Sequence, residues 1–315
     1  MPNPSSIFSF KRSNPLAGFV LFVLLVLVIE TVLAFMPQNS LITAIGRIPT
    51  PAKSPDFQIM GDSVAQGGII ASQLSDELGG ASVANLAVAA TGPEFPYFLL
   101  KRQLAAGIAP KEIIYSPSPH TFGTRRIALL IGAYASWPEV AEIAVARIEP
   151  FEVMYGVLCK LSFSLRNREQ LSELFKGRKA PEGFQQAAPK PATATANADR
   201  FPAKNLHPMF KQSFKVMDFN GQFHRKFLAT AAANGIKVNW VSVPSLEVVR
   251  EARKPLDYDA RYQAFLRSVR DEFSVRLLMP ESTLMEPRFF KDYSHLNSEG
   301  AAVFTKTVGA ALKAR

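Results

Sequence analysis

The segment Asp56-Phe-Gln-Ile-Met-Gly-Asp-Ser63 places a short apolar strand directly before a glycine and two polar side chains. A strand of this kind that leads into a helical pattern is typical of the first unit of a parallel α/β sheet. Further strand patterns occur at 82–88, 112–116, 236–243 and 275–278, and helical patterns at 64–78, 94–106, 127–148, 214–234, 257–273 and 298–312. The alternation predicts an α/β protein whose parallel sheet has helices on both faces.

Polar side chains gather where the predicted strands end. They lie at 61–63, 85–92, 116–120 and 244–245, and again at 291–297 near the end of the chain. In an open parallel sheet, ligands bind in the crevice at the carboxyl ends of the strands. The sequence therefore predicts a functional site at this edge.

Ser63, Asp292 and His295 are the candidate catalytic residues at that edge. A serine hydroxyl is a weak nucleophile unless an imidazole, itself oriented by a carboxylate, removes its proton. The spacing of Asp292 and His295 suits contact between the carboxylate and Nδ1, which leaves Nε2 for Ser63. The competing interpretation is structural, because Gly-Asp-Ser is also an ordinary turn and Asp-x-x-His-Leu-Asn an ordinary helix entry.

Gly61-Asp62-Ser63 and Asp292-x-x-His295-Leu-Asn297 together resemble the first and last motifs of the SGNH (GDSL-type) hydrolase superfamily. The resemblance implies a flavodoxin-like three-layer α/β/α fold and hydrolysis or transfer of acyl esters. It also implies oxyanion donors in the backbone N–H groups of Ser63, Ala90 and Gly92, although this glycine comes two residues later than usual. The family's third motif, Gly-x-Asn-Asp, is absent. The possible site-lining residues in this region are Asn85, Ser118 and His120, and Ser118 or His120 are the candidates to replace the missing asparagine.

Residues 16–36 form a continuous apolar segment, interrupted only by Glu30 and Thr31. Twenty-one helical residues span about 31 Å, close to the hydrocarbon thickness of a bilayer. Lys11 and Arg12 precede the segment, so the positive-inside rule predicts a cytoplasmic N-terminus at 1–15 and an extracytoplasmic remainder, in the periplasm or at the cell surface. A cleaved signal peptide and a buried core helix are the alternatives to this single-pass anchor.

Two stretches divide the rest of the chain. The proline-rich residues 37–55 predict a tether, and residues 56–315 an SGNH-like domain. Within that domain, 176–204 has five prolines and almost no large apolar side chains, which predicts a disordered insert. Its basic residues suit either a solvated loop or an arm that contacts a polyanion.

Composition excludes several classes of function. The chain has 315 residues, a formal net charge of +10 and a single cysteine, Cys159. One cysteine excludes an internal disulfide, and no convincing third ligand joins Asp292 and His295, so we expect neither a metal nor another cofactor. The positive charge suits an anionic surface, but no motif supports nucleic-acid binding.

The leading hypothesis is a membrane-anchored serine esterase or O-acyltransferase that acts on acylated envelope carbohydrate or lipid. An anchor followed by an SGNH-like domain resembles the layout of periplasmic exopolysaccharide O-acetylation and teichoic-acid D-alanylation proteins. The alternative is a non-catalytic binding or assembly factor for envelope polysaccharide, with envelope-assembly proteins as partners. The missing asparagine and the displaced glycine favour that alternative.

Overall fold

The computed structural model describes residues 15–35, 51–124, 127–146, 149–168, 171–172, 176 and 200–314. The sheet consists of β1 (Phe57–Gly61), β2 (Val83–Asn85), β3 (Glu112–Ser116), β4 (Lys237–Val241) and β5 (Arg276–Met279). All neighbouring strands are parallel, in the order β2-β1-β3-β4-β5. This is the flavodoxin-like order, in which the chain reverses direction across the sheet between β1 and β3. The predicted α/β class with a parallel sheet is confirmed.

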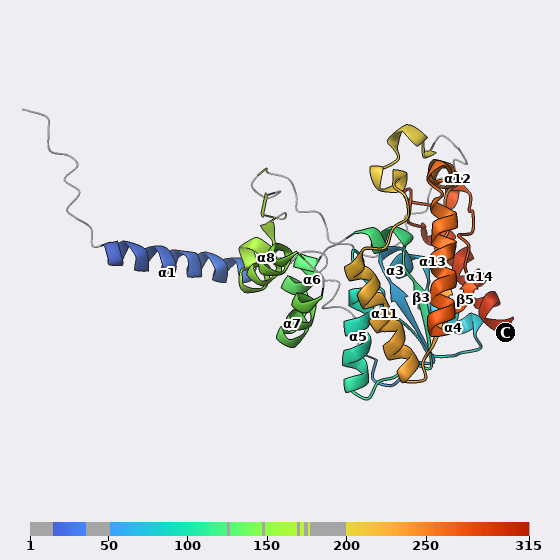
Figure 1. Ribbon diagram of the computed structural model, residues 1–315, viewed down its shortest axis with the longest axis horizontal. Helices are drawn as coiled ribbons and strands as arrows, with labels where there is room; N and C mark the ends of the chain where they lie inside the picture. Colours follow the sequence, from blue (N-terminus) through green and yellow to red (C-terminus); the bar gives the residue numbers. More distant parts are fainter. Residues whose placement is uncertain are drawn as a thin grey trace, which may run out of the picture.

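Helices cover both faces of this sheet (Figure 1). One face packs against α5 (Glu94–Ala105), α11 (Asp218–Ala233) and α13 (Tyr258–Phe273). The other packs against α3 (Ser63–Gly68), α4 (Ala71–Glu77), α12 (Glu247–Arg253) and α14 (Ser298–Lys313). Each face of the sheet has its own buried apolar cluster, as expected of a parallel sheet whose strands are hydrophobic on both sides.

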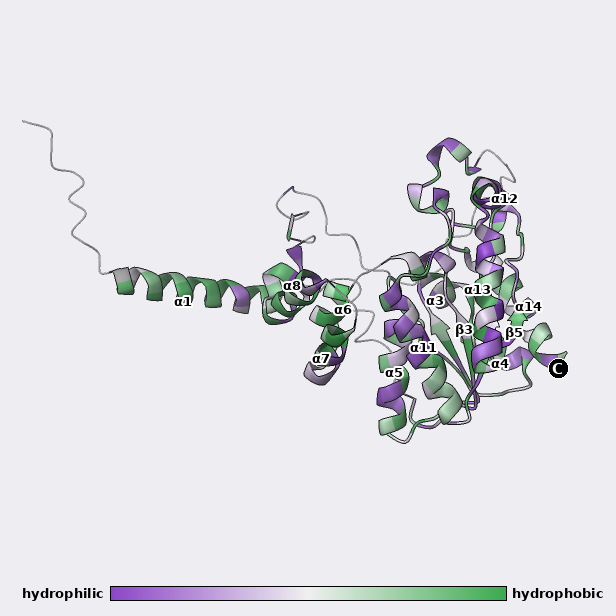
Figure 2. Cartoon of the chain, in the orientation of Figure 1, coloured by the Kyte–Doolittle hydropathy of each residue, from purple (hydrophilic) through white to green (hydrophobic). Residues whose placement is uncertain are grey.

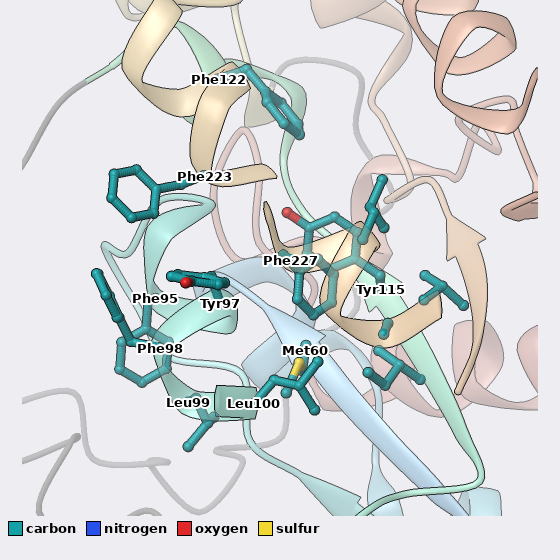
Figure 3. Close-up of a cluster of buried hydrophobic side chains, with 14 of the residues drawn as sticks. Met60, Phe95, Tyr97, Phe98, Leu99, Leu100, Tyr115, Phe122, Phe223 and Phe227 are labelled. Carbon is teal, nitrogen blue, oxygen red and sulfur yellow. The ribbon is translucent and has the colours of Figure 1, made fainter. Parts of the chain in front are cut away.

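Aromatic rings dominate the first of the two clusters. Figure 3 shows rings from α5 and α11 gathered near Met60 of β1 and Tyr115 of β3. Phe98 and Phe223 are completely buried, and their ring centroids lie 5.3 Å apart in a tilted arrangement. Such pairs contribute about 0.5–1.5 kcal/mol beyond the burial of their area, so this face fixes the sheet against α5 and α11.

Two predicted helices are each divided in the structure. The segment 64–78 breaks at Ile69 and Ile70 into α3 and α4, next to the flexible pair Gly67-Gly68. The segment 127–148 breaks into α6 (Ile127–Ala133) and α7 (Trp137–Val145), because Ser136 begins a new helix and its N–H donates to Glu139 Oε2 at 2.7 Å. Two helices that the sequence did not predict follow, α8 (Pro150–Leu161) and α9 (Phe163–Arg166).

Helix α1 (Pro15–Ala34) occupies most of the predicted anchor, and apolar residues predominate along it (Figure 2). Its Glu30 accepts hydrogen bonds from the backbone N–H of Phe163, at 2.6 Å, and from the hydroxyl of Ser162, at 2.8 Å. These bonds join α1 to the start of α9. Within the described ranges, the structure contains no helix that combines the length and apolar character needed to cross a bilayer. The predicted transmembrane anchor at 16–36 is therefore not confirmed.

The predicted tether and insert lie largely outside the described residues. At the end of the tether, Ser54 Oγ accepts the N–H of Ala109 at 2.9 Å, which fixes this end beside the sheet. At the end of the insert, Phe201 is buried and Pro202 accepts the hydroxyl of Tyr293 at 2.8 Å. Residues 200–204 are thus part of the folded domain, and the predicted disorder stays a prediction for the preceding segment.

The turn from β1 into α3 requires a glycine. Gly61 has φ +156°, and a Cβ atom at this position would lie 2.4 Å from the carbonyl oxygen of Ser116 and 2.7 Å from Cβ of Ala65. The first of these contacts is to the backbone of the neighbouring strand β3, which cannot yield without disturbing the sheet.

We expect Gly61→Ala to destabilise the protein by about 1–3 kcal/mol, since the added methyl group overpacks a rigid site. Gly67→Ala is the matched control, because a Cβ there meets nothing within 4 Å. Because alanine is favoured over glycine in a helix, the free energy of unfolding of this control should increase by roughly 0.5–1 kcal/mol. Urea unfolding followed by circular dichroism measures both; equal effects of the two substitutions would contradict the close approach.

Candidate active site

Ser63 and His295 meet at the carboxyl edge of the sheet, although they lie 232 positions apart in the chain. Ser63 is the first residue of α3, directly after β1, and His295 lies in the loop that precedes α14. The distance from Ser63 Oγ to His295 Nε2 is 2.8 Å. This is hydrogen-bond distance, so the imidazole is placed to accept the proton of the hydroxyl.

Asp292 orients the imidazole from its other side. Its two carboxylate oxygens lie 2.9 and 2.8 Å from Nδ1 of His295. Burial acts to raise the pKa of Asp292, but hydrogen bonds from the His295 ring and from the backbone N–H of Ser294 outweigh it and hold this pKa well below its ordinary value. An ionised carboxylate only accepts hydrogen bonds. Nδ1 of His295 must therefore carry the proton, and Nε2 is the acceptor that faces Ser63.

The loop that carries Asp292 and His295 is held by its own backbone. Asp292 Oδ1 also accepts the N–H of His295 at 2.8 Å, and the N–H of Lys291 donates to the carbonyl of His295 at 2.9 Å. Asn297 ends the loop as the N-cap of α14, where its side chain accepts the N–H of Gly300. The Asp-x-x-His-Leu-Asn motif thus contains both a tight turn and a helix start.

Asp62 has a structural role in the same region. Its buried carboxylate accepts the N–H of Val64 at 3.0 Å, as the N-cap of α3, and the N–H of Ser118 at 3.1 Å. One carboxylate therefore connects the turn after β1 with the loop after β3. This contact fixes Ser63 and Ser118 on the same edge of the sheet.

The expected oxyanion donors differ in what their N–H groups contact. Ser63 lies at the first position of α3, where a backbone N–H has no intrahelical acceptor. Ala90 has φ +61°, unusual for a residue other than glycine, and its N–H has no acceptor in the described part of the chain. The N–H of Gly92, in contrast, donates to Glu94 Oε1 at 3.3 Å. Ser63 and Ala90 are the better candidates.

The three possible site-lining residues separate into two groups. Asn85 Nδ2 donates to the carbonyl of Ile69 at 2.9 Å, so this side chain ties the end of β2 to the end of α3. Ser118 and His120 line a cleft next to the reactive pair. The hydroxyl of Ser118 is buried and has no hydrogen-bond partner among the described residues. Its hydrogen-bonding capacity is therefore unused within the described residues.

The cleft is small, with about 20 Å³ in which the centre of a water-sized molecule can lie. Val64, Tyr293 and Ser294, which are close neighbours of the catalytic candidates, form part of its wall. Arg253, at the end of α12, also lines it. Arg253 was not among the predicted site residues, because no helix and no motif were predicted at 247–253. Its only signal in the sequence is its place shortly after the polar edge at 244–245.

The other histidines contribute to structure. His224 is buried in the aromatic cluster, where its ring stacks on Tyr115 at 5.7 Å between centroids, and burial lowers its pKa to about 3. His207 accepts the N–H of Met209 at the start of a short 3₁₀ helix.

Comparisons with known proteins give limited information. No protein-family model matches the chain, and no curated protein matches it. Among solved structures, it is similar to a "putative acylhydrolase" from Bacteroides fragilis, with 13% sequence identity and a TM-score of 0.37. The match covers 86% of this chain and 94% of that chain.

Glu94 is a second unusual carboxyl group near the site. It is buried at the start of α5, and its Oε2 has no hydrogen-bond partner among the described residues. Burial raises its pKa to about 7 from 4.5, although the N–H groups of Glu94 and Gly92 act to lower it. The folded protein therefore favours the protonated form. Its contribution to stability is full below about pH 4.5 and is lost as the pH rises through about 7.

We expect Glu94→Gln to remove this pH dependence, because the amide cannot ionise. Between pH 4 and pH 8, the stability of the variant should rise relative to the natural protein by about 3 kcal/mol, which corresponds to 2.5 pKa units. Urea unfolding at a series of pH values measures this difference. Glu299→Gln, at an exposed carboxyl, is the control and should show no such trend. Parallel pH curves for Glu94→Gln and the natural protein would rule out a raised pKa.

Proposed function

We propose that this protein is a serine esterase or O-acyltransferase that acts on acyl esters through an acyl-serine intermediate. The observation that carries the proposal is the continuous chain of contacts Asp292–His295–Ser63, with 2.8 Å at both hydrogen-bond steps. Nucleophile, base and orienting carboxylate in this arrangement are the requirements for acyl transfer by a serine hydroxyl.

In the first half-reaction, Ser63 Oγ attacks the ester carbonyl while Nε2 of His295 takes the hydroxyl proton. Asp292 remains ionised and stabilises the imidazolium that forms. The negative charge on the former carbonyl oxygen requires nearby donors, and the N–H groups of Ser63 and Ala90 are the candidates. When the tetrahedral intermediate collapses, His295 returns the proton to the departing alcohol and the acyl group stays on Ser63.

In the second half-reaction, His295 removes a proton from water or from an acceptor hydroxyl. The resulting nucleophile attacks the acyl-serine, and Ser63 regains its proton from His295 as the bond breaks. Water gives hydrolysis and a sugar hydroxyl gives acyl transfer. The hydroxyl of Ser118, buried and without a partner, is a candidate donor to the oxyanion in place of the missing asparagine.

The substrate class and the location are part of the proposal and rest on the sequence. An acylated carbohydrate or lipid of the cell envelope suits the net charge of +10, because such molecules are frequently acidic. Attachment of the chain to a membrane and an extracytoplasmic domain stay predictions.

A fluorophosphonate probe tests the nucleophile directly. We expect it to label the natural protein at Ser63, and Ser63→Ala and His295→Ala to abolish labelling. Asp292→Asn should slow labelling on the order of 10⁴-fold, because the imidazole loses the carboxylate that fixes its tautomer. Ser72→Ala, at an exposed serine of α4, is the matched control and should be labelled at the natural rate.

The alternative function is that of a binding or assembly factor without turnover. It is favoured by the contact between Gly92 and Glu94, which engages one of the expected oxyanion donors. Absence of probe labelling in a folded protein that still binds an acylated glycan would support this alternative and contradict the enzyme.

A further inference from the structure

Arg253 occupies an unusual position in the wall of the cleft. Arg253 is only 7% exposed. Val64, Tyr293 and Ser294, which are close to Ser63 and His295 in the chain, line the same cleft. Arg253 reaches this place because α12 follows β4 by way of the segment 243–245, which crosses the carboxyl edge of the sheet. A permanently charged side chain therefore lines the same cleft as Val64 and Ser294, the residues that adjoin Ser63 and His295 in the chain.

This guanidinium has no counter-ion in the described part of the chain. None of the ion pairs there includes Arg253, and its Nε is completely buried without a hydrogen-bond partner. Arg250, three residues earlier on the same helix, also has a buried Nε without a partner, but its guanidinium forms an ion pair with Glu247 at 2.8 Å. Burial of an unpaired charge is costly, since the energy of hydration is lost without replacement.

Two aromatic rings make cation–π contacts with the guanidinium. Its central carbon lies 4.3 Å from the ring centroid of Tyr258 and 5.6 Å from that of Phe210. A cation–π contact attracts the charge but accepts no N–H in a hydrogen bond, so the terminal N–H groups of the guanidinium keep their capacity to donate. Those N–H groups are suited to bind two oxygens of one planar or tetrahedral anion.

We propose that Arg253 is a specificity residue that binds an anionic oxygen group, carboxylate or phosphate, on the substrate whose ester lies at Ser63. The inference rests on the proposed function and narrows its substrate class to acidic acyl esters. The group that would compensate the buried charge is then supplied by the substrate. Ser282 lies in the same wall and offers a further hydroxyl to that anion.

The test compares three matched acetyl esters. O-acetylated methyl glucuronoside, O-acetylated methyl glucoside and O-acetylated glucose 6-phosphate differ in carrying a carboxylate, no charge or a phosphate. Acetate release by the full-length protein at low salt gives kcat/KM for each. We expect at least one anionic ester to exceed the neutral ester by tenfold or more, and the preferred one identifies the anion.

Substitution of Arg253 should remove this preference. We expect Arg253→Gln to lower kcat/KM for the anionic ester at least tenfold more than for the neutral one, and Arg253→Lys to retain part of the preference. Arg250→Gln is the control on the same helix and should keep the full preference. No preference in the natural protein, or an equal loss on all three esters with Arg253→Gln, would overturn the proposal.

A binding measurement separates this inference from the proposed function. Calorimetric titration of the Ser63→Ala protein with glucuronate and with glucose 6-phosphate needs no turnover. If either anion binds the Ser63→Ala protein and no longer binds when Arg253→Gln is added, the result supports the anion subsite. This holds even if no ester is hydrolysed. Failure of both anions to bind, in a protein with an unchanged melting temperature, contradicts the subsite whether or not the esterase activity is found.

Discussion

The buried carboxylate of Asp62 is the contact on which the site depends. It accepts one N–H from the start of α3 and another from the loop after β3, so a single side chain sets the relation between the two strands at which the sheet order reverses. Gly61 allows the backbones to approach closely enough for this contact. The pairing of β1 with β3 brings the two strand ends together, and Asp62 then fixes the serine at the start of α3 relative to the loop after β3.

The sequence predicted the sheet and the contact between Asp292 and His295 well, because both depend on local patterns. Strand β3 was placed at its observed bounds, 112–116, and the Asp292-x-x-His295 spacing suggested a contact within one turn that the structure shows. The breaks within 64–78 and 127–148 were missed because apolar periodicity continues across them. Arg253 was missed because burial of a charged side chain depends on rings from Tyr258 and Phe210, far from any local motif.

Two carboxyl groups near the site are driven toward opposite protonation states by their surroundings. Asp292 accepts several N–H groups and is held ionised, whereas Glu94 is buried with one oxygen lacking a partner, and its pKa rises to about 7. The first state provides the negative charge that an imidazolium needs. The second reduces the negative charge that Glu94 carries beside the N–H of Gly92 when the pH is below about 7.

The contact between Tyr293 and Pro202 gives the insert a mechanical connection to the catalytic loop. Tyr293 immediately follows Asp292, and its hydroxyl donates a hydrogen bond to the backbone carbonyl of Pro202. The backbone at Pro202 and the residue after Asp292 therefore cannot shift independently, so a displacement of residues 200–202 would also disturb the loop that holds the imidazole.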